Sequence, residues 1–295
     1  MRVGFVGIGA MGHPMAANIL EAGYELRVFD VKEKSAKVLA AQGAITCPDL
    51  EVLAKGSEVV MMSLPGPKEV KGVATEILES LSPGKVLIDL STNSPSLIRE
   101  IDSIAKFKKV DFLDAPVSGG TYGAKKGELT VMVGGGREQF EALEPLWNCI
   151  GSNIFHVGKV GSGNIAKLVN NMLAFSNMMS NAEALVLGAK AGIDPNVLWG
   201  IVKTSSGSSV TWIGGVKAIL KDRLDPNFTV NLACKDIDLA ADLAAEVGVD
   251  LPMASVAKQL LGEFRSNGFA NEDILSTIKA FEGSAGVSVR GVWKD

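Results

Sequence analysis

Apolar and polar positions alternate in two different ways along the first half of the chain. Short runs rich in Val, Ile, Leu, Phe and Met are bounded by Gly, Pro or charged residues, which is typical of strands buried on both faces. We expect such strands at Val3–Val6, Leu26–Phe29, Val59–Ser63, Val86–Asp89, Phe112–Asp114 and Leu129–Val133. Amphipathic segments lie between them, including Pro14–Ala22, closed by Gly23, and Lys34–Gln42, closed by Gly43. This order predicts a doubly wound α/β fold with a mostly parallel sheet.

The pattern changes near residue 162, where the strand-like runs stop. The segment Gly163–Ala191 predicts one helix, roughly 40 Å long at 1.5 Å per residue. Further helices are expected at Pro195–Lys203, with Asp194 as N-cap, and at Leu232–Val247, Pro252–Ser266 and Asp273–Glu282. We therefore predict two domains: a sheet domain over 1–162, and an all-helical C-terminal domain over 163–295 that begins with a long interdomain helix, 163–191.

The composition limits the functions that a protein with this fold could have. The 295 residues are 47% apolar and 21% charged, which suits a globular chain of two domains. The formal net charge is −4, and no block of Lys and Arg is longer than a pair. A polyanion-binding surface is therefore not expected, and neither is a nucleic-acid partner.

Cysteine and histidine usage argues against disulfides and metals. Cys47, Cys149 and Cys234 are odd in number and widely spaced, and the chain has only two histidines. These residues form neither a disulfide framework nor a zinc-binding pattern, which suits a reducing compartment. The start of the chain lacks the apolar core of a signal peptide, and no run of 18 apolar residues occurs. We expect a cytoplasmic protein without a metal or a membrane partner.

The first chemical signal is a glycine-rich loop after the first predicted strand. Gly7, Gly9 and Gly12, with Ala10 and Met11 between the last two, have the spacing of a dinucleotide-binding loop. In such a loop the first glycine allows the turn, the second lets the pyrophosphate approach, and the third packs helix on strand. Taken alone, the motif also fits a glycine-rich turn that binds nothing.

An acidic residue in register with the loop favours the dinucleotide interpretation. Asp30 ends the second predicted strand, 18 residues after Gly12, where a carboxylate accepts hydrogen bonds from the adenosine ribose hydroxyls. The same carboxylate repels a 2′-phosphate, so NAD is preferred as cofactor. Lys32 and Lys34 leave NADP possible, although both also fit a solvated helix start. Together these features predict a Rossmann-type nicotinamide-dinucleotide domain.

The second signal is a lysine on an apolar helix. No charged residue occurs between Lys167 and Glu183, and Asn171 lies one turn after Lys167 on the same helix face. One interpretation is structural: the lysine stem packs while its amine stays in water. In the other, the helix start lies at the mouth of the cofactor cleft. A partly desolvated amine there exchanges a proton with a substrate hydroxyl.

The third signal is a set of residues that come after other strands of the predicted sheet. Ser118, Gly119 and Gly120 come shortly after the strand that ends at Asp114, and offer a hydroxyl and unobstructed backbone N–H groups to an anion such as a carboxylate. An ordinary Gly-Gly turn is the alternative. Leu64-Pro65 and Thr92 also follow strands, at the sheet edge where ligands bind in open α/β folds, and could line the cofactor.

Four segments together resemble one enzyme family over essentially the whole chain. They are Gly7–Asn18, Asp114–Gly120, Gly161–Asn171 and Lys235–Ala240, and the pattern is similar to that of the β-hydroxyacid dehydrogenases. That family includes 3-hydroxyisobutyrate dehydrogenases, 2-hydroxy-3-oxopropionate (tartronate semialdehyde) reductases and glyoxylate or succinic semialdehyde reductases. The resemblance implies hydride transfer between a nicotinamide and a small 3-hydroxy acid or its semialdehyde.

The resemblance also implies a role for each matching residue. Lys167 becomes the general acid/base and Asn171 a substrate-binding residue, while Ser118, Gly119 and Gly120 bind the substrate carboxylate. The residues implied to contact the cofactor outside the glycine loop are Leu64, Pro65, Thr92 and Lys235. From the residues alone, Lys235 and Asp236 would be a surface charge pair. A homodimer or homotetramer is expected, because the long apolar helix carries Met178 and Met179.

Other functions remain open at this point. Within the family, a succinic semialdehyde or glyoxylate reductase fits equally well, because no motif identifies the substrate. 6-Phosphogluconate dehydrogenases and imine reductases share the architecture, but the former usually have a much larger helical domain. A remote alternative is a protein that binds a dinucleotide without catalysis.

Overall fold

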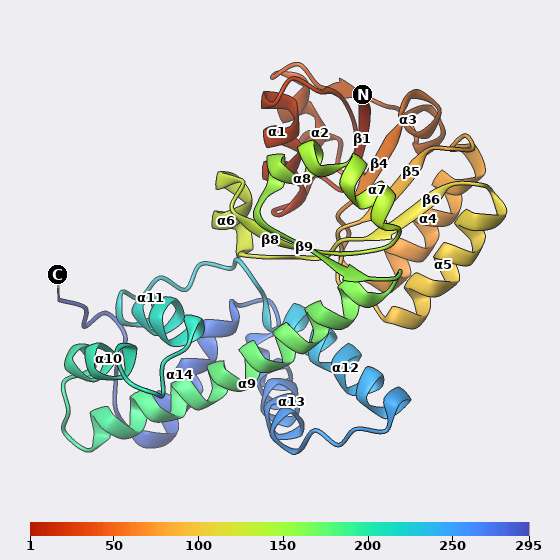
Figure 1. Ribbon diagram of the computed structural model, residues 1–295. Coiled ribbons are helices and arrows are strands. Elements are labelled where there is room, and N and C mark those ends of the chain that lie inside the picture. The colour runs from red at the N-terminus through yellow and green to blue at the C-terminus, as the bar shows by residue number, and fades with distance from the viewer. Residues whose placement is uncertain (295) are drawn as a thin grey trace. The chain divides into compact units, whose positions relative to one another are not determined.

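The computed structural model describes residues 1–294 and divides the chain into two compact units (Figure 1). The first unit is Met1–Lys167, and the second begins at Leu168. The division falls within the helix α9 (Ser162–Lys190), which the sequence predicts as one long helix. The domain limits 1–162 and 163–295 remain a prediction.

The first unit is built on one sheet whose central strands are parallel. Its strand order is β3-β2-β1-β4-β5-β6-β8-β7, with β9 paired to β8. The strands β1 to β6 pair in parallel, whereas β8 runs antiparallel to both β6 and β7. The strands are β1 (Arg2–Val6), β2 (Glu25–Phe29), β3 (Ile45–Thr46), β4 (Val59–Met62), β5 (Val86–Asp89), β6 (Asp111–Asp114), β7 (Val117–Ser118), β8 (Leu129–Gly134) and β9 (Gly151–Gly158).

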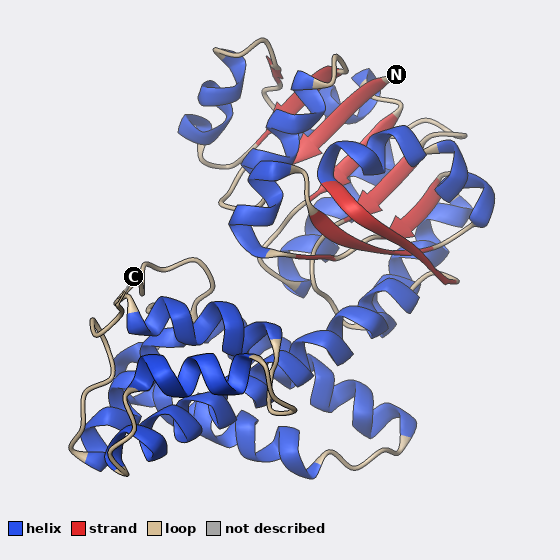
Figure 2. Cartoon of the chain, turned by 60° about the vertical axis from the view of Figure 1, so that its left-hand side comes forward, coloured by secondary structure: helices blue, strands red, loops and turns tan. Residues whose placement is uncertain are grey.

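Helices cover both faces of this sheet (Figure 2). Successive residues of β1 point to opposite faces, because Val3 and Phe5 belong to one apolar cluster and Val6 to the other. The first cluster takes side chains from α1 (Gly12–Glu21), α2 (Glu33–Ala40), α6 (Gly120–Lys126) and α8 (Glu144–Ile150). The second takes them from α3 (Leu50–Gly56), α4 (Pro67–Ser80) and α5 (Pro95–Phe107). The short helix α7 (Arg137–Ala142) precedes α8. The unit is a doubly wound Rossmann-type domain.

The six strands expected from the sequence are present, and three strands were missed. β3 and β7 have only two residues each, too few to give a pattern. β9 is longer, but half-buried and exposed residues alternate along it, so it lacks the continuous apolar run that identified the other strands.

The second unit is helical and packs around the later part of α9. Phe175 and Met179 of α9 pack against α12 and α13, while Leu185 packs in a separate cluster with Trp212. The helical segments after α9 are α10 (Pro195–Lys203), a π-helix at Thr211–Val216, α11 (Lys217–Leu220), α12 (Val230–Val247), α13 (Pro252–Phe264), a π-helical turn at Arg265–Phe269, a 3-10 helix at Ile274–Thr277 and α14 (Ile278–Ala285). Within residues 1–294, no helix combines the length and apolarity that a membrane span needs.

Asp273 shows why one expected helix is divided. The sequence predicts a single helix from Asp273 to Glu282, but a 3-10 turn comes first and α14 follows it. The Asp273 carboxylate accepts from the N–H of Leu275 at 3.0 Å, and from those of Asn227 and Phe228 at 2.9 and 3.1 Å. These bonds hold the start of the segment against another loop, where a regular α-helical turn does not form.

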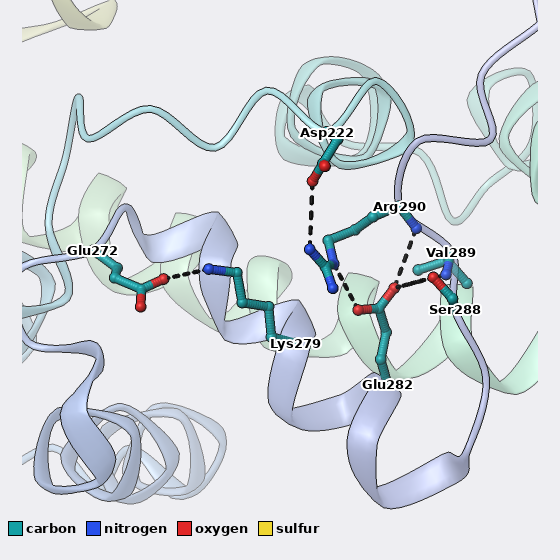
Figure 3. A network of polar contacts seen from close by, with 7 residues as sticks. All are labelled: Asp222, Glu272, Lys279, Glu282, Ser288, Val289 and Arg290. Atoms are coloured by element: carbon teal, nitrogen blue, oxygen red, sulfur yellow. Dashed lines mark hydrogen bonds and ion pairs between the residues drawn. The ribbon is translucent and has the colours of Figure 1, made fainter.

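A buried carboxylate anchors the C-terminal segment to α14 (Figure 3). Glu282 accepts hydrogen bonds from the N–H of Val289 at 2.7 Å and from Nε of Arg290 at 2.7 Å. Arg290 also pairs with Asp222 at 3.5 Å. Burial raises the pKa of Glu282, but the bonds from Val289 and Arg290 outweigh it, so the pKa lies below its usual value. The carboxylate is therefore held in its charged form.

Candidate active site

The carboxyl ends of five parallel strands coincide at one edge of the sheet. In register across the sheet lie Phe29, Val6, Met62, Asp89 and Asp114, the last residues of β2, β1, β4, β5 and β6. The residues that follow these strand ends therefore emerge side by side. They include most of the site residues that the sequence predicts in this unit: the glycine loop, Asp30, Leu64, Pro65 and Thr92.

The glycine loop fits a dinucleotide. Gly7 has φ +89°, and a Cβ added there would collide with the carbonyl oxygen of Ser63. A Cβ on Gly12 would collide with the carbonyl oxygen of Gly7, so helix α1 packs closely against the loop. Gly9 differs, because a Cβ there would meet no atom within 4 Å. The loop is thus tightly packed at its two ends and open in the middle, at the residue where a pyrophosphate has to approach. Ala10 is exposed and Met11 half-buried.

Asp30 joins this loop to the end of β2. One carboxylate oxygen accepts from the N–H of Ile8 at 2.6 Å, and the other from the N–H of Lys32 at 2.7 Å. Each carboxylate oxygen can accept a further bond, so the group can still bind the hydroxyls of a ribose. Lys32 and Lys34 have exposed side chains. The residues present therefore fit the adenosine side of NAD.

The segments after β4 and β5 are joined by side-chain hydrogen bonds. The N–H of Leu64 donates to Oγ of Ser91 at 2.9 Å, which holds the Leu64-Pro65 turn beside Thr92. Leu64 and Thr92 are half-buried, and Pro65 is exposed. The sequence identified these residues by their position after strands, but it did not identify Ser91 as the group that connects them.

The predicted anion-binding turn is more regular than a simple loop. Val117 and Ser118 form the strand β7, which pairs with β8, and Gly120 begins helix α6. Gly119 has φ +131° and Gly120 has φ +62°, conformations that favour glycine. Ser118 is half-buried, and both glycines are exposed. The short strand fixes the direction in which the turn leaves the sheet.

A buried carboxylate connects the end of β6 with the first turn of α9. Oδ1 of Asp114 accepts from the N–H of Gly161 at 2.7 Å, and Oδ2 accepts from the N–H and Nδ2 of Asn164 at 2.8 and 3.1 Å. Oδ1 of Asn164 accepts in turn from the N–H of Asn93 at 2.7 Å. Lys167 follows Asn164 by one helical turn and is 9% exposed. These bonds bring the start of the lysine-bearing helix to the edge that carries the other predicted residues.

A second buried carboxylate extends this network. Asp89 accepts from Nδ2 of Asn93 at 2.6 Å and from the N–H of Ser91 at 3.0 Å. Burial raises the pKa of Asp89 to about 7, although the hydrogen bonds from Ser91 and Asn93 oppose the shift. Burial likewise raises the pKa of Asp114 to about 6, against the bonds from Gly161 and Asn164. Neither carboxylate was assigned a role from the sequence, although each is a charged residue at the end of an apolar strand.

In the second unit, one carboxylate holds two of the predicted residues. Nδ2 of Asn171 donates to Oδ2 of Asp236 at 2.7 Å, and Nζ of Lys235 lies 2.8 Å from Oδ1 of the same carboxylate. Oδ1 of Asn171 accepts from Nδ2 of Asn170 at 3.1 Å. Asp236 is buried on α12, so the pair is not the surface charge pair that the residues alone suggested. Asp236 orients the amide of Asn171.

The predicted residues of the first unit, from the glycine loop to Lys167, thus emerge at one sheet edge or are tied to it. Within the described residues, no group of three or more His, Cys, Asp and Glu side chains could hold a metal ion. An open glycine loop, a carboxylate placed where it could bind a ribose and a buried lysine are features of a dinucleotide-dependent oxidoreductase.

Comparison with known proteins assigns the family. Residues 2–158 match the model of the NAD-binding domain of 6-phosphogluconate dehydrogenase. Residues 161–281 match that described as NAD-binding of NADP-dependent 3-hydroxyisobutyrate dehydrogenase. The chain belongs to the β-hydroxyacid dehydrogenase family, and it is an NAD(P)-dependent oxidoreductase of small hydroxy acids.

Similar proteins cover nearly the whole chain. A 2-(hydroxymethyl)glutarate dehydrogenase of Eubacterium barkeri is 39% identical, over 99% of this chain and 98% of the relative. An NAD-dependent L-serine dehydrogenase of Pseudomonas aeruginosa is 36% identical, over 97% of this chain and 99% of the relative. The solved structure of 3-hydroxyisobutyrate dehydrogenase of Mycobacterium tuberculosis with L-serine has a TM-score of 0.87 and 30% identity, covering 95% of this chain and 99% of that one.

Proposed function

We propose that the chain is an NAD-preferring dehydrogenase of 3-hydroxy acids in which Lys167 is the general acid/base. The observation that carries this proposal is the placement of Lys167. It is 9% exposed, and it lies one turn after residues that are hydrogen-bonded to the carboxyl ends of the strands. A lysine amine in such a position can exchange a proton with a substrate hydroxyl.

Bound NAD(P) supplies the acceptor of the hydride in oxidation and its donor in reduction. In oxidation, the neutral amine of Lys167 removes the proton of the substrate hydroxyl. In reduction, its ammonium form protonates the alkoxide that develops on the substrate. Asn171, one turn further along α9, holds the substrate, and its orientation depends on Asp236.

Two further groups of residues complete the proposed site, one for the substrate carboxylate and one for the cofactor. Ser118, with the backbone N–H groups of Gly119 and Gly120, binds the substrate carboxylate and thereby fixes the position of the reacting carbon relative to Lys167. The cofactor is held by residues of the loop and the strand ends, and by one lysine of α12. They are Gly7, Gly9, Ala10, Met11, Gly12, Asp30, Leu64, Pro65, Thr92 and Lys235.

The preference for NAD rests on Asp30. Its carboxylate is fixed by Ile8 and Lys32 at the end of β2, where a 2′-phosphate would meet a negative charge. Family members that prefer NADPH tend to carry Asn-Arg after the second strand, whereas this chain has Asp30-Val31. Lys32 keeps weaker use of NADP open.

The substrate class follows from chemistry that the named relatives share. 2-(Hydroxymethyl)glutarate, L-serine and 3-hydroxyisobutyrate each carry a primary hydroxyl on the carbon β to a carboxylate. They differ only in the substituent on the carbon between these groups. A carboxylate clamp at one fixed distance from Lys167 selects this spacing.

A spectrophotometric screen of cofactor reduction tests the proposal. The panel contains 3-hydroxyisobutyrate, L-serine, 2-(hydroxymethyl)glutarate and glycerate, each with NAD and with NADP. Glycolate and 4-hydroxybutyrate, with one carbon fewer and one more between the two groups, serve as spacing controls. We expect turnover of at least one β-hydroxy acid, faster with NAD. Faster turnover of a spacing control would favour a glyoxylate or succinic semialdehyde reductase, and binding of NAD without any turnover would favour a non-catalytic protein.

We also propose a homodimer or homotetramer in the cytoplasm. Met178 and Met179, which suggested subunit contact from the sequence, pack within the second unit instead. Exposed apolar residues on α9 support the proposal better: Val169 is 53% exposed and Leu173 57%. The three cysteines are free, which supports a reducing compartment. Light scattering of the purified protein tests the oligomeric state.

A further inference from the structure

One carboxylate is bonded to the helix that carries Lys167 and ends the strand that leads to the proposed anion-binding turn. The backbone of Asp114 belongs to β6, four residues before Ser118. Its side chain is fully buried and accepts three hydrogen bonds from Gly161 and Asn164, at the start of α9. The backbone of Asp114 would therefore position the turn that binds the substrate carboxylate. Its side chain would position the helix whose lysine meets the reacting hydroxyl.

Close packing shows that the carboxylate has little room to adjust. A Cβ on Gly163 would lie 2.7 Å from the carbonyl oxygen of Asp114 and 2.9 Å from its Oδ2. A Cβ on Gly134 of β8 would lie 2.9 Å from the backbone nitrogen of Gly163 and would collide with Oδ1 of Asp114. The first turn of α9 thus rests directly on the backbone of β6 and β8, and only glycine fits at these contacts.

The acceptor pattern requires a carboxylate at this position. Backbone N–H groups approach both oxygens, from Gly161 on one side and from Asn164 on the other. An asparagine keeps one acceptor oxygen, but it turns an NH₂ group toward the second N–H. One of the two bonds must then break. The strand itself stays in place, because the sheet holds its backbone.

We propose that Asp114 is a positioning residue, which acts through Asn164 and the first turn of α9 to fix Lys167 relative to the anion-binding turn; this rests on the proposed role of Lys167. Two parts of the structure thus make separate contributions to catalysis. The segment from β6 to Gly120 sets substrate binding, and the bonds of the Asp114 side chain set the position of the amine. Loss of these bonds affects kcat and leaves KM nearly unchanged.

Steady-state kinetics of Asp114→Asn test this division, with the panel acid that the wild-type enzyme oxidises fastest. The matched control is Asp111→Asn, at the exposed amino end of the same strand, where the carboxylate accepts a hydrogen bond from Nε2 of Gln139 at 3.2 Å. We expect kcat of Asp114→Asn to fall about 10–100-fold, since small displacements of a catalytic group have effects of this size. The KM of the acid and the Kd of NAD should change less than about threefold. Asp111→Asn should behave as wild type.

Hydrogen exchange gives a readout that does not depend on turnover. In Asp114→Asn, at least one of the amides of Gly161 and Asn164 should exchange about tenfold faster, because one lost hydrogen bond changes local opening by about this factor. Amides of β6 should stay protected. A kcat within about twofold of wild type, or a KM that rises as much as kcat falls, would overturn the proposal.

Two further variants keep the test decisive. If Asp114→Asn does not fold, Asn164→Ala replaces it. This variant keeps both backbone bonds to Asp114 and loses the two bonds of the Asn164 side chain: the one that Nδ2 donates to Asp114 and the one that Oδ1 accepts from the N–H of Asn93. Its kcat should fall about 3–10-fold with an unchanged KM, and an unchanged kcat would reject the inference. Lys167→Ala separates the two hypotheses. An active Lys167→Ala would reject the proposed function, whereas an inactive Lys167→Ala beside an active Asp114→Asn would reject only the role of Asp114.

Discussion

Asp89 and Asp114, at the ends of β5 and β6, hold the network together but lower the stability of the folded chain, because their carboxylates are buried. Asp89 and Asp114 are fully buried, and burial raises the pKa of Asp89 to about 7 and that of Asp114 to about 6. Asp89 accepts from the N–H of Ser91 and from Nδ2 of Asn93, and Asp114 accepts from the N–H groups of Gly161 and Asn164 and from Nδ2 of Asn164. Such groups keep the ends of the strands and the start of α9 in register, and the fold tolerates the buried charge.

The raised pKa of Asp89 predicts that stability decreases as pH increases. Between its ordinary value near 3.8 and its folded value near 7, the unfolded chain has released this proton while the folded chain retains it. The contribution of Asp89 to the free energy of unfolding is therefore fully present below pH 3.8 and is lost as the pH rises above about 7. Relative to Asp89→Asn, the wild type should lose about 3 kcal/mol of unfolding free energy from about pH 5 to about pH 8. Urea unfolding at both pH values measures this difference, and parallel pH dependences of the two proteins would contradict it.

At the scale of elements, polar side chains determine where several helices begin and end. Asp194 accepts from the N–H of Asn196 and starts α10, with Pro195 in its first turn, as the sequence predicts. The start of α9 depends on Asp114 and Asn93, which lie far from it in the sequence. The end of α14 is fixed by Glu282, whose partners Val289 and Arg290 lie in the segment after the helix.

Glu282→Gln should destabilise the helical unit by about 2–4 kcal/mol, because it leaves Arg290 without its buried partner. Glu272→Gln is the matched control, since Glu272 also pairs with a cation, Lys279, at 2.7 Å, but is 41% exposed (Figure 3). Loss of that exposed pair should cost less than about 1 kcal/mol. Thermal and urea unfolding of both variants give the comparison. Equal destabilisation by the two substitutions would show that burial of the Glu282 carboxylate is not what matters.

At the scale of the whole molecule, the sequence revealed the features that nearby residues encode, but not the contacts between distant residues. The apolar runs predicted the central strands, and the uncharged stretch after Lys167 predicted α9, because these signals lie in consecutive residues. The glycine loop and Asp30 were found by spacing. The bonds that join Asp114 to Asn164, and Asp236 to Asn171, connect residues 50 and 65 positions apart. No local pattern encodes such contacts, so the sequence identified the groups proposed to react but not those that hold them.

The central claim is that the buried amine of Lys167 transfers the substrate proton, and one kinetic comparison tests it most directly. Lys167→Ala is measured beside Lys190→Ala, which removes an exposed lysine from the other end of α9. We measure kcat in both reaction directions and the Kd of NAD by fluorescence titration. The account predicts that Lys167→Ala binds NAD normally and loses kcat by about 10²–10⁴-fold, while Lys190→Ala keeps wild-type values. A near-normal kcat in Lys167→Ala would contradict the account.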